Sequence, residues 1–357
     1  MTAQRPGPAP RPLRLATYNV EWMNALFDDQ GQLLQDGEPS SRYKTSRGEQ
    51  LAALGIVFTA LDPDGILIVE APDTNGHRQT TRALENFARA MGLRARKALI
   101  GYPSETEQEI AFLYDPDRLT ARHDPQGVPS TSHGSPDAPR FDTTFRYDLD
   151  ADGLSETIRF SKPPLELAIT TSEGHKLRLI GMHAKSKNPH GAVGREAMIR
   201  LSIENRRKQL AQFLWLRQRV EGHLAAGDRL VVLGDFNDGP GIDEFEKLFG
   251  HSGVEIVLGT TPDPAMTLTD PHATMALQSR ISLAPTSARF YLAPQKRFFE
   301  ALLDFIMVSP DLAAKGPDWR IWHPFNDPRI LEVPELRGAL LQASDHFPVT
   351  VDFPTGV

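Results

Sequence analysis

The stretch Gly234-Asp235-Phe236-Asn237-Asp238-Gly239-Pro240 decides how this sequence is interpreted. It follows an apolar run at 229–233, which predicts a buried strand, and it ends in residues that favour a turn. Asp235 and Asn237 therefore stand where a strand ends in a loop, and because they are two residues apart they point to the same side. An Asx turn explains this segment equally well, so the interpretation depends on the other strand ends.

The remaining apolar runs predict a layered α/β fold. They predict strands at residues 13–20, 65–70, 109–114, 165–170, 177–183, 303–308 and 347–353. Apolar residues at helical spacing occur around 51–61, 84–91 and 203–214. Helices between some strands, together with closely spaced strand pairs, indicate mixed sheets covered by helices.

Composition excludes several classes of protein. The chain has 357 residues, no cysteine and a net charge of −7. Disulfides, thiol catalysis and cysteine-ligated zinc are excluded, and the protein as a whole is not a basic nucleic-acid binder. One segment differs, because residues 185–219 hold only Glu196 and Glu204 as acids. Its bases are Lys185, Lys187, Arg195, Arg200, Arg206, Arg207, Lys208, Arg217 and Arg219. Such a field would attract a phosphorylated substrate, although a solvated helix face explains the charges equally well.

The sequence predicts one domain. Residues 1–12 are rich in proline and arginine and are expected to form a disordered lead-in, with a single domain at 13–357. A polar excursion is expected at about 121–162, and a turn-rich one at 261–299. No run has the length of a membrane span and no secretory signal is recognisable, so a cytoplasmic location is expected.

Polar residues recur at the ends of the predicted strands. They are Asn19 and Glu21, then Glu70, then His183 with Lys185 and Lys187, then Asp304, and finally Asp345 and His346. Each has a structural explanation by itself, as a turn cap, an ion pair or a satisfied core histidine. Together they are the residue types that a hydrolytic metal site requires, and their hard oxygen ligands suit Mg²⁺ or Mn²⁺.

At this point the sequence resembles the endonuclease/exonuclease/phosphatase superfamily of metal-dependent phosphoesterases. The blocks TYNVEW (17–22), ILIVE (66–70), IAFLYDP (110–116), IGMHAKSK (180–187), VVLGDFND (231–238), LLDFIMVS (302–309) and SDHFPV (344–349) occur in the family's order. The resemblance implies a deoxyribonuclease I-like, four-layer α-β-β-α sandwich of two packed mixed sheets. RFSKPPLELAI (159–169) is most similar to the bacterial extracellular-nuclease-like branch.

The resemblance also implies roles for the site residues. Glu70, Glu21 and Asp345 would hold the divalent metal, Asp235 would deprotonate the attacking water, and Asn19 and Asn237 would place the phosphate. His346, oriented by Asp304, would stabilise the transition state, while His183, Lys185 and Lys187 would contact phosphate. Which histidine protonates the leaving group stays open. Val69 replaces the family's usual glutamine before the metal-binding glutamate, so support for that ligand is expected to differ.

A second metal site is a separate hypothesis. Asp148, Asp150 and Asp152 start a D-x-D-x-D-G pattern typical of calcium loops. Arg159 stands at the twelfth position, where an EF-hand needs glutamate, so a solvated acidic turn is the alternative to Ca²⁺ binding.

The predicted function is a Mg²⁺- or Mn²⁺-dependent phosphoester hydrolase, a phosphodiesterase or nuclease that uses an Asp-activated water. A phosphatase or phosphodiesterase for a small molecule or lipid headgroup, and an inactive binding module, are the alternatives. Nucleic acid is favoured over a small molecule by the basic segment, but no aromatic–basic tract for stacking is visible along the sequence. No obligate protein partner is indicated.

Overall fold

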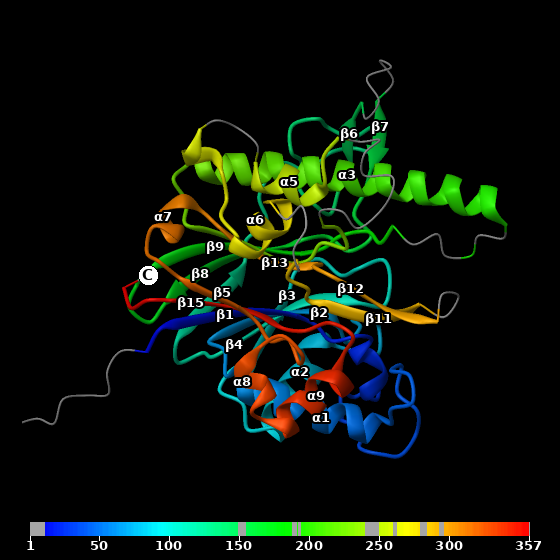
Figure 1. The fold of residues 1–357 in the computed structure, drawn as a ribbon. Helices are drawn as coiled ribbons and strands as arrows, with labels where there is room; N and C mark the ends of the chain where they lie inside the picture. The colour runs from blue at the N-terminus through cyan, green and yellow to red at the C-terminus, as the bar shows by residue number, and fades with distance from the viewer. Residues whose placement is uncertain are drawn as a thin grey trace, which may run out of the picture.

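The computed structural model describes residues 11–148, 155–187, 191, 194–239, 250–259, 263–278, 284–292 and 296–356. Figure 1 shows two sheets packed face to face between two groups of helices. This is the predicted four-layer α-β-β-α arrangement, and it places three apolar layers inside the molecule.

The larger sheet has six strands in the order β14-β15-β1-β2-β4-β3. Its strands are β1 (Leu13–Asn19), β2 (Gly65–Ala71), β3 (Lys97–Ile100), β4 (Glu109–Tyr114), β14 (Asp318–Ile321) and β15 (Val349–Phe353). β1 and β2 run parallel, whereas β15 and β4 are antiparallel to them. The parallel pair therefore brings the ends of β1 and β2, and with them Asn19 and Glu70, to the same edge.

The second sheet has five strands in the order β13-β10-β9-β8-β5. Its strands are β5 (Leu119–His123), β8 (Leu165–Thr171), β9 (Lys176–His183), β10 (Leu230–Asp235) and β13 (Asp304–Val308). β9 and β10 run parallel and pair His183 with Asp235, while antiparallel β13 pairs Asp304 with Asp235. Because β1 packs on β10 between the sheets, the polar ends of both sheets meet at one edge.

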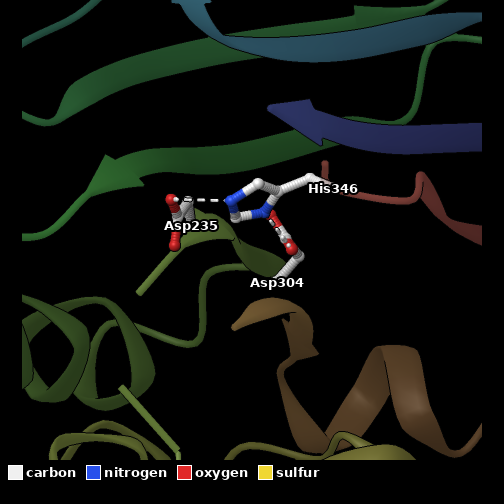
Figure 2. Close-up of side chains that lie close together, drawn as sticks. All are labelled: Asp235, Asp304 and His346. Atoms are coloured by element: carbon white, nitrogen blue, oxygen red, sulfur yellow. Dashed lines mark hydrogen bonds and ion pairs between the residues drawn. The ribbon is translucent and has the colours of Figure 1, made fainter. Parts of the chain in front are cut away.

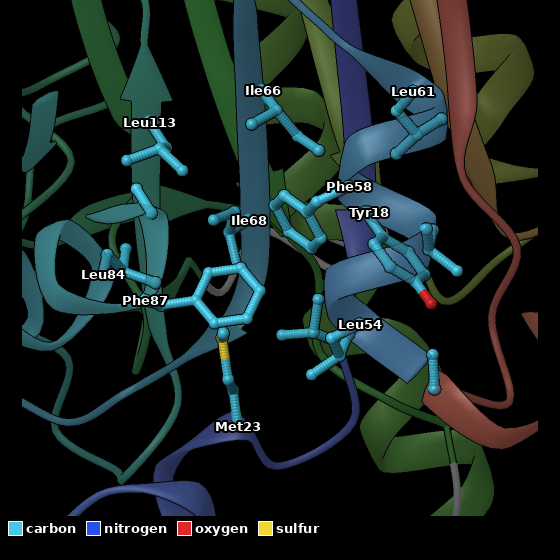
Figure 3. Packing of buried hydrophobic residues seen from close by; sticks show 14 of the residues in the cluster. Tyr18, Met23, Leu54, Phe58, Leu61, Ile66, Ile68, Leu84, Phe87 and Leu113 are labelled. Carbon is cyan, nitrogen blue, oxygen red and sulfur yellow. The ribbon is translucent and has the colours of Figure 1, made fainter. Parts of the chain in front are cut away.

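Helices cover the outer face of each sheet (Figure 1). The six-stranded sheet is covered by α1 (Arg47–Leu61), α2 (Thr80–Ala90), α8 (Pro328–Leu331) and α9 (Pro334–Ala343). Figure 3 shows Phe58 of α1 and Phe87 of α2 meeting beside β2, with ring centroids 5.2 Å apart. The five-stranded sheet is covered by α3 (Arg195–Ala225), α5 (Gly253–Leu258) and α6 (Pro271–Gln278). A short α7 (Pro310–Ala313) follows β13.

The two predicted excursions contain regular structure. Residues 121–162 begin within β5, an edge strand of the second sheet, and include the hairpin of β6 (Phe145–Tyr147) and β7 (Glu156–Ile158). Residues 261–299 include η2 (Pro264–Met266), α6 and most of the hairpin of β11 (Ala288–Leu292) and β12 (Arg297–Ala301). A further 3-10 turn, η1 (Met23–Leu26), follows β1. In the described part of the chain, no helix combines the length and the apolar character needed to cross a membrane.

Gly234, the residue before Asp235, allows the backbone of β10 to lie very close to the backbone of β9. Its φ is +138°, and a Cβ atom there would lie 2.0 Å from the backbone oxygen of Met182. Both the backbone conformation and this contact therefore exclude any side chain at position 234.

We therefore expect Gly234→Ala to lower the free energy of unfolding by about 2–4 kcal/mol, because backbone must move to admit the methyl group. Chemical denaturation measures this change. Gly76→Ala is the control, since a Cβ atom there meets nothing within 4 Å. Equal stability of both variants would contradict the close approach.

Candidate active site

Asp235 lies at the centre of the polar cluster between the ends of the two sheets. Its side chain is buried, and each of its two oxygens accepts a hydrogen bond. The backbone N–H of Asn237 donates to Oδ1 at 2.7 Å, and Asn19 Nδ2 donates to Oδ2 at 3.0 Å. Asn19 Nδ2 also lies 3.4 Å from Glu70 Oε1. Asn19 therefore links the carboxylate of one sheet to that of the other.

Two histidines flank the same oxygen of Asp235. His183 Nε2 lies 3.8 Å and His346 Nε2 lies 3.9 Å from Asp235 Oδ2. Figure 2 shows the His346 ring between Asp235 and Asp304, with Nδ1 2.8 Å from Asp304 Oδ2. Ser287 Oγ donates to Asp304 Oδ2 at 2.7 Å and thereby fixes the carboxylate that orients the ring.

The environment shifts the pKa values of the two histidines in opposite directions. Burial opposes protonation of His346, but Asp304 and Asp235 outweigh it and hold the pKa of His346 well above its ordinary value. Burial, assisted by Lys162 and His346, holds the pKa of His183 well below its ordinary value. At neutral pH His346 is therefore an imidazolium and His183 is neutral.

Burial also changes the charge state of Asp235. It raises the pKa of this carboxyl group to about 7, and Asp304 adds to the effect, while His346 and the bonds from Asn237 and Asn19 oppose it. A carboxylate whose pKa lies near neutrality can take a proton from water more readily than an exposed aspartate can.

Three further carboxylates gather beside this cluster. Trp22 N donates to Glu70 Oε2 at 2.9 Å, and Asp345 N donates to Glu21 Oε2 at 3.1 Å. Arg42 forms an ion pair with Glu21. Burial, then the neighbouring Asp345, raise the pKa of Glu21 to about 7. Close carboxylates that repel one another are stabilised by a cation, and their oxygen donors fit Mg²⁺ or Mn²⁺.

The backbone at these positions is strained. Glu21, Trp22, Glu70 and Asn237 have φ values of 43°, 56°, 59° and 47°, in the left-handed region that side chains rarely adopt. At Glu70 the pairing of β2 with β4 shifts register, as at a β-bulge. A bulge redirects the side chain of the extra residue, and strained residues of this kind concentrate at functional sites.

Asp235, Asp304 and His346 also have ligand atoms within 4.8 Å of one another. His346 Nδ1 is bonded to Asp304, however, so this group forms a hydrogen-bonded row and does not present free ligands. Among the described residues, Glu70, Glu21 and Asp345 do not form such a close group, although carboxylates are the ligand type that Mg²⁺ or Mn²⁺ prefers.

The structure separates the two lysines predicted to contact phosphate. Lys185 is exposed, whereas Lys187 Nζ lies 2.5 Å from Asp238 Oδ1 in a largely buried ion pair. Sequence analysis missed Lys162, which is half-buried, bonded to Gln108 and placed in the field of Glu70 and Asp235. Burial lowers the pKa of Lys162, and these carboxylates oppose the shift. Lys162 is the lysine of the RFSKPP block (159–164), so this motif could have pointed to it.

The predicted basic face of residues 185–219 is only partly a surface. Arg206, Arg217 and Arg219 are buried. Arg219 pairs with Glu166, and Arg217 donates to the carbonyl oxygens of Val257, Leu258 and Met266. Those three bases stabilise the packing of α3, so only the other bases of the segment can present their charge to a substrate. The sequence shows charge but does not show which side of the helix is covered.

The predicted calcium loop falls mostly outside the described residues. Asp148 is described, whereas Asp150 and Asp152 are not, so the loop stays a prediction.

Comparison with known proteins identifies the family of the chain. Residues 16–346 match the model of the Endonuclease/Exonuclease/phosphatase family. The chain belongs to this family and is a phosphoester hydrolase, which confirms the resemblance. No curated protein matches the chain.

Solved structures are similar over most of the chain at low identity. Truncated TDP2 from Caenorhabditis elegans has a TM-score of 0.49 at 13% identity, covering 96% of this chain and 97% of that chain. The human Nocturnin catalytic domain with bound sulfate has a TM-score of 0.47 at 14% identity, covering 96% and 94%. Mannosyl-6-phosphatase Bt3783 from Bacteroides thetaiotaomicron has a TM-score of 0.46 at 13% identity, covering 96% and 99%.

Asp304→Asn tests whether Asp304 raises the pKa of His346. Removing this charge should lower the pKa of His346, since Asp304 is the largest influence that raises it. The measurement is an NMR titration of the histidine ring protons. Asp117→Asn, at an exposed carboxylate paired with Arg96, is the control. An unchanged His346 titration in Asp304→Asn would show that the ring is not governed by this contact.

Proposed function

We propose that this protein is a divalent-metal-dependent phosphodiesterase that cleaves nucleic acid by in-line attack of a water activated by Asp235. One observation carries the proposal. A buried carboxylate whose pKa lies near 7 is held by two asparagines and lies 3.8 and 3.9 Å from the Nε2 atoms of two histidines, one neutral and one protonated. Acid, base and charge-stabilising groups then surround one point.

Asp235 acts as the general base in this proposal. Its two hydrogen-bond partners hold the carboxylate in one orientation, so that the water it activates is aligned with the phosphorus atom. Asn237 has a second contact, from Nδ2 to the backbone oxygen of Ala184 at 3.1 Å. This contact fixes the amide beside the base, where a phosphate oxygen would be bound.

His346 stabilises the negative charge that develops on the phosphoryl oxygens. Asp304 accepts the hydrogen bond at Nδ1, so the protonated Nε2 faces the substrate side. Neutral His183 offers a second ring Nε2 near the same oxygen of Asp235. Either ring has the geometry to serve the leaving oxygen, and Lys162 adds a positive charge near Glu70.

Glu70, Glu21 and Asp345 would hold the divalent cation. The cation would neutralise negative charge on the phosphoester. Glu70 is fixed for this role by the N–H of Trp22, and Glu21 by the N–H of Asp345.

The test is hydrolysis of plasmid DNA and of bis-p-nitrophenyl phosphate, each with Mg²⁺, with Mn²⁺ and with EDTA. Metal-dependent nicking supports the nuclease. Ester cleavage without nicking would assign the same site to a small-molecule or lipid-headgroup phosphoester instead. Absence of both activities with metal present would leave a binding module and overturn the proposal.

We expect Asp235→Asn and His346→Ala each to reduce turnover by at least about 10²-fold, because each removes the base or a transition-state contact. Steady-state kinetics on bis-p-nitrophenyl phosphate measures the loss. Asp137→Asn and His133→Ala, both at exposed residues, are the matched controls. Losses below tenfold in both active-site variants would mean that these roles are misassigned.

The proposal also predicts a pH dependence. A general base works when deprotonated, so kcat/KM should fall as the pH drops through the pKa of Asp235, about 7, and should level off above it. A cation bound at Glu70 would favour the carboxylate and lower that midpoint. A pH–rate profile measures it, and activity that rises on acidification from pH 8 to 6 would contradict the role of Asp235.

A further inference from the structure

Four aromatic side chains are exposed among the described residues. Trp22, Tyr43, Tyr291 and Phe298 are 44%, 83%, 54% and 52% exposed. Aromatic rings are enriched at binding interfaces, and exposed rings that are grouped mark contact surfaces, whereas single exposed rings are common. These four residues, termed the aromatic rim, lie on segments that are tied directly to the candidate metal ligands.

Trp22 and Tyr43 lie beside the glutamates. The N–H of Trp22 is the group that binds Glu70. Tyr43 follows Arg42, which pairs with Glu21 and also donates from Nη2 to the backbone oxygen of Leu341 at 2.9 Å. Both rings are therefore carried by backbone that is fixed to the site.

Tyr291 and Phe298 lie on the β11–β12 hairpin, which is bonded to the segment of Asp345 and His346. Arg289 N donates to Asp345 O at 2.7 Å, and Phe347 N donates to Ser287 O at 2.6 Å. Ala288 and His346 form an isolated bridge between these bonds. Figure 1 shows the hairpin projecting on the side where β1 ends.

The two faces of this hairpin differ. Phe290 and Phe299 lie on one face and pack on Ala288, Ala301 and Leu303. Tyr291 and Phe298 are paired across the strands on the other face, with ring centroids 5.3 Å apart, and stay exposed. The small apolar cluster under the hairpin includes one aromatic pair, whereas the other pair lies outside it.

Cations lie on or near these rings. Arg289 Cζ is 3.6 Å from the centroid of Phe298, and Lys44 Nζ is 5.1 Å from that of Tyr43. Lys296 is exposed at the start of β12. Rings that stack on bases, interleaved with cations that attract phosphates, are the means by which proteins bind unpaired strands.

We propose that the aromatic rim binds the unpaired bases of a single-stranded nucleic acid, with the Tyr291–Phe298 pair as the main stacking surface. This inference rests on the proposed function, because it places a phosphate of the same strand at Asp235. Bases within a duplex are already stacked on one another, so the rim favours single strands or frayed ends. The four rings come from segments far apart in the chain, which is why they form no aromatic–basic tract along the sequence.

The experiment compares two probes that share phosphates and differ in bases. One is a single-stranded oligonucleotide of about ten nucleotides, and the other is an abasic strand of the same length. Binding is measured by fluorescence anisotropy on Asp235→Asn protein with Mg²⁺, so that neither probe is cut. The base-containing strand should bind at least about tenfold more tightly. Tyr291→Ala/Phe298→Ala in the same background should remove most of this preference and leave abasic binding unchanged.

Two control variants separate stacking from folding. Tyr291→Phe/Phe298→Tyr keeps both rings and should keep the preference. Met275→Ala removes a side chain that is 55% exposed on α6 and should change nothing. Equal binding of the two probes, no binding of either, or a preference that survives the double alanine variant would each overturn the inference. Hydrolysis of bis-p-nitrophenyl phosphate by the wild-type protein is assayed separately, so loss of the stacking surface is distinguished from failure of the proposed hydrolase.

Discussion

Burial of the Asp235 carboxylate between two sheets is the constraint on which the rest of the site depends. A charged group in this position is costly unless hydrogen bonds and opposite charge compensate it. Asn19 comes from the other sheet to supply one bond, and the turn at Asn237 supplies another. His346 supplies the positive charge. The groups that stabilise the buried carboxylate are the same groups that surround a reacting phosphate in the proposed function.

The supporting contacts extend this constraint outward. Asp304 is itself buried and needs Ser287 and His346 as partners, and Ser287 also accepts from the backbone of Leu303 and Asp304. Ser344 Oγ donates to the backbone oxygen of Asn19, which joins the segment of Asp345 and His346 to the first strand. Buried polar networks of this kind are stable only when nearly every member is satisfied. Loss of one member therefore disturbs residues that are distant in sequence.

The basic residues of α3 fall into two groups, one buried and one outside the packed part of the helix. Arg206, Arg217 and Arg219 are buried and fix the helix to its surroundings through carboxylates and carbonyl oxygens. The N-terminal turns of α3 extend beyond the sheets on the side where β1 ends (Figure 1). In the proposed function, the substrate would be attracted by the bases outside the packed part of the helix, by Lys162 and by the cations of the aromatic rim. A site with local positive charge is compatible with a net charge of −7 for the chain.

The sequence by itself determined the layered fold, the order of the strands along the chain, and the polar residues at the strand ends. Apolar runs and their spacing report burial directly, so strands such as β4 and β9 were located to within a residue. Tertiary structure alone decided which of these residues meet, since the pairing of β9 with β10 and the packing of β1 on β10 bring together side chains more than 200 positions apart. It also decided that Lys187 pairs with Asp238, that Lys162 lies in the field of Glu70 and Asp235, and that Trp22, Tyr43, Tyr291 and Phe298 stay exposed. A sequence pattern shows local burial and spacing, whereas charge states and neighbours depend on contacts between distant segments.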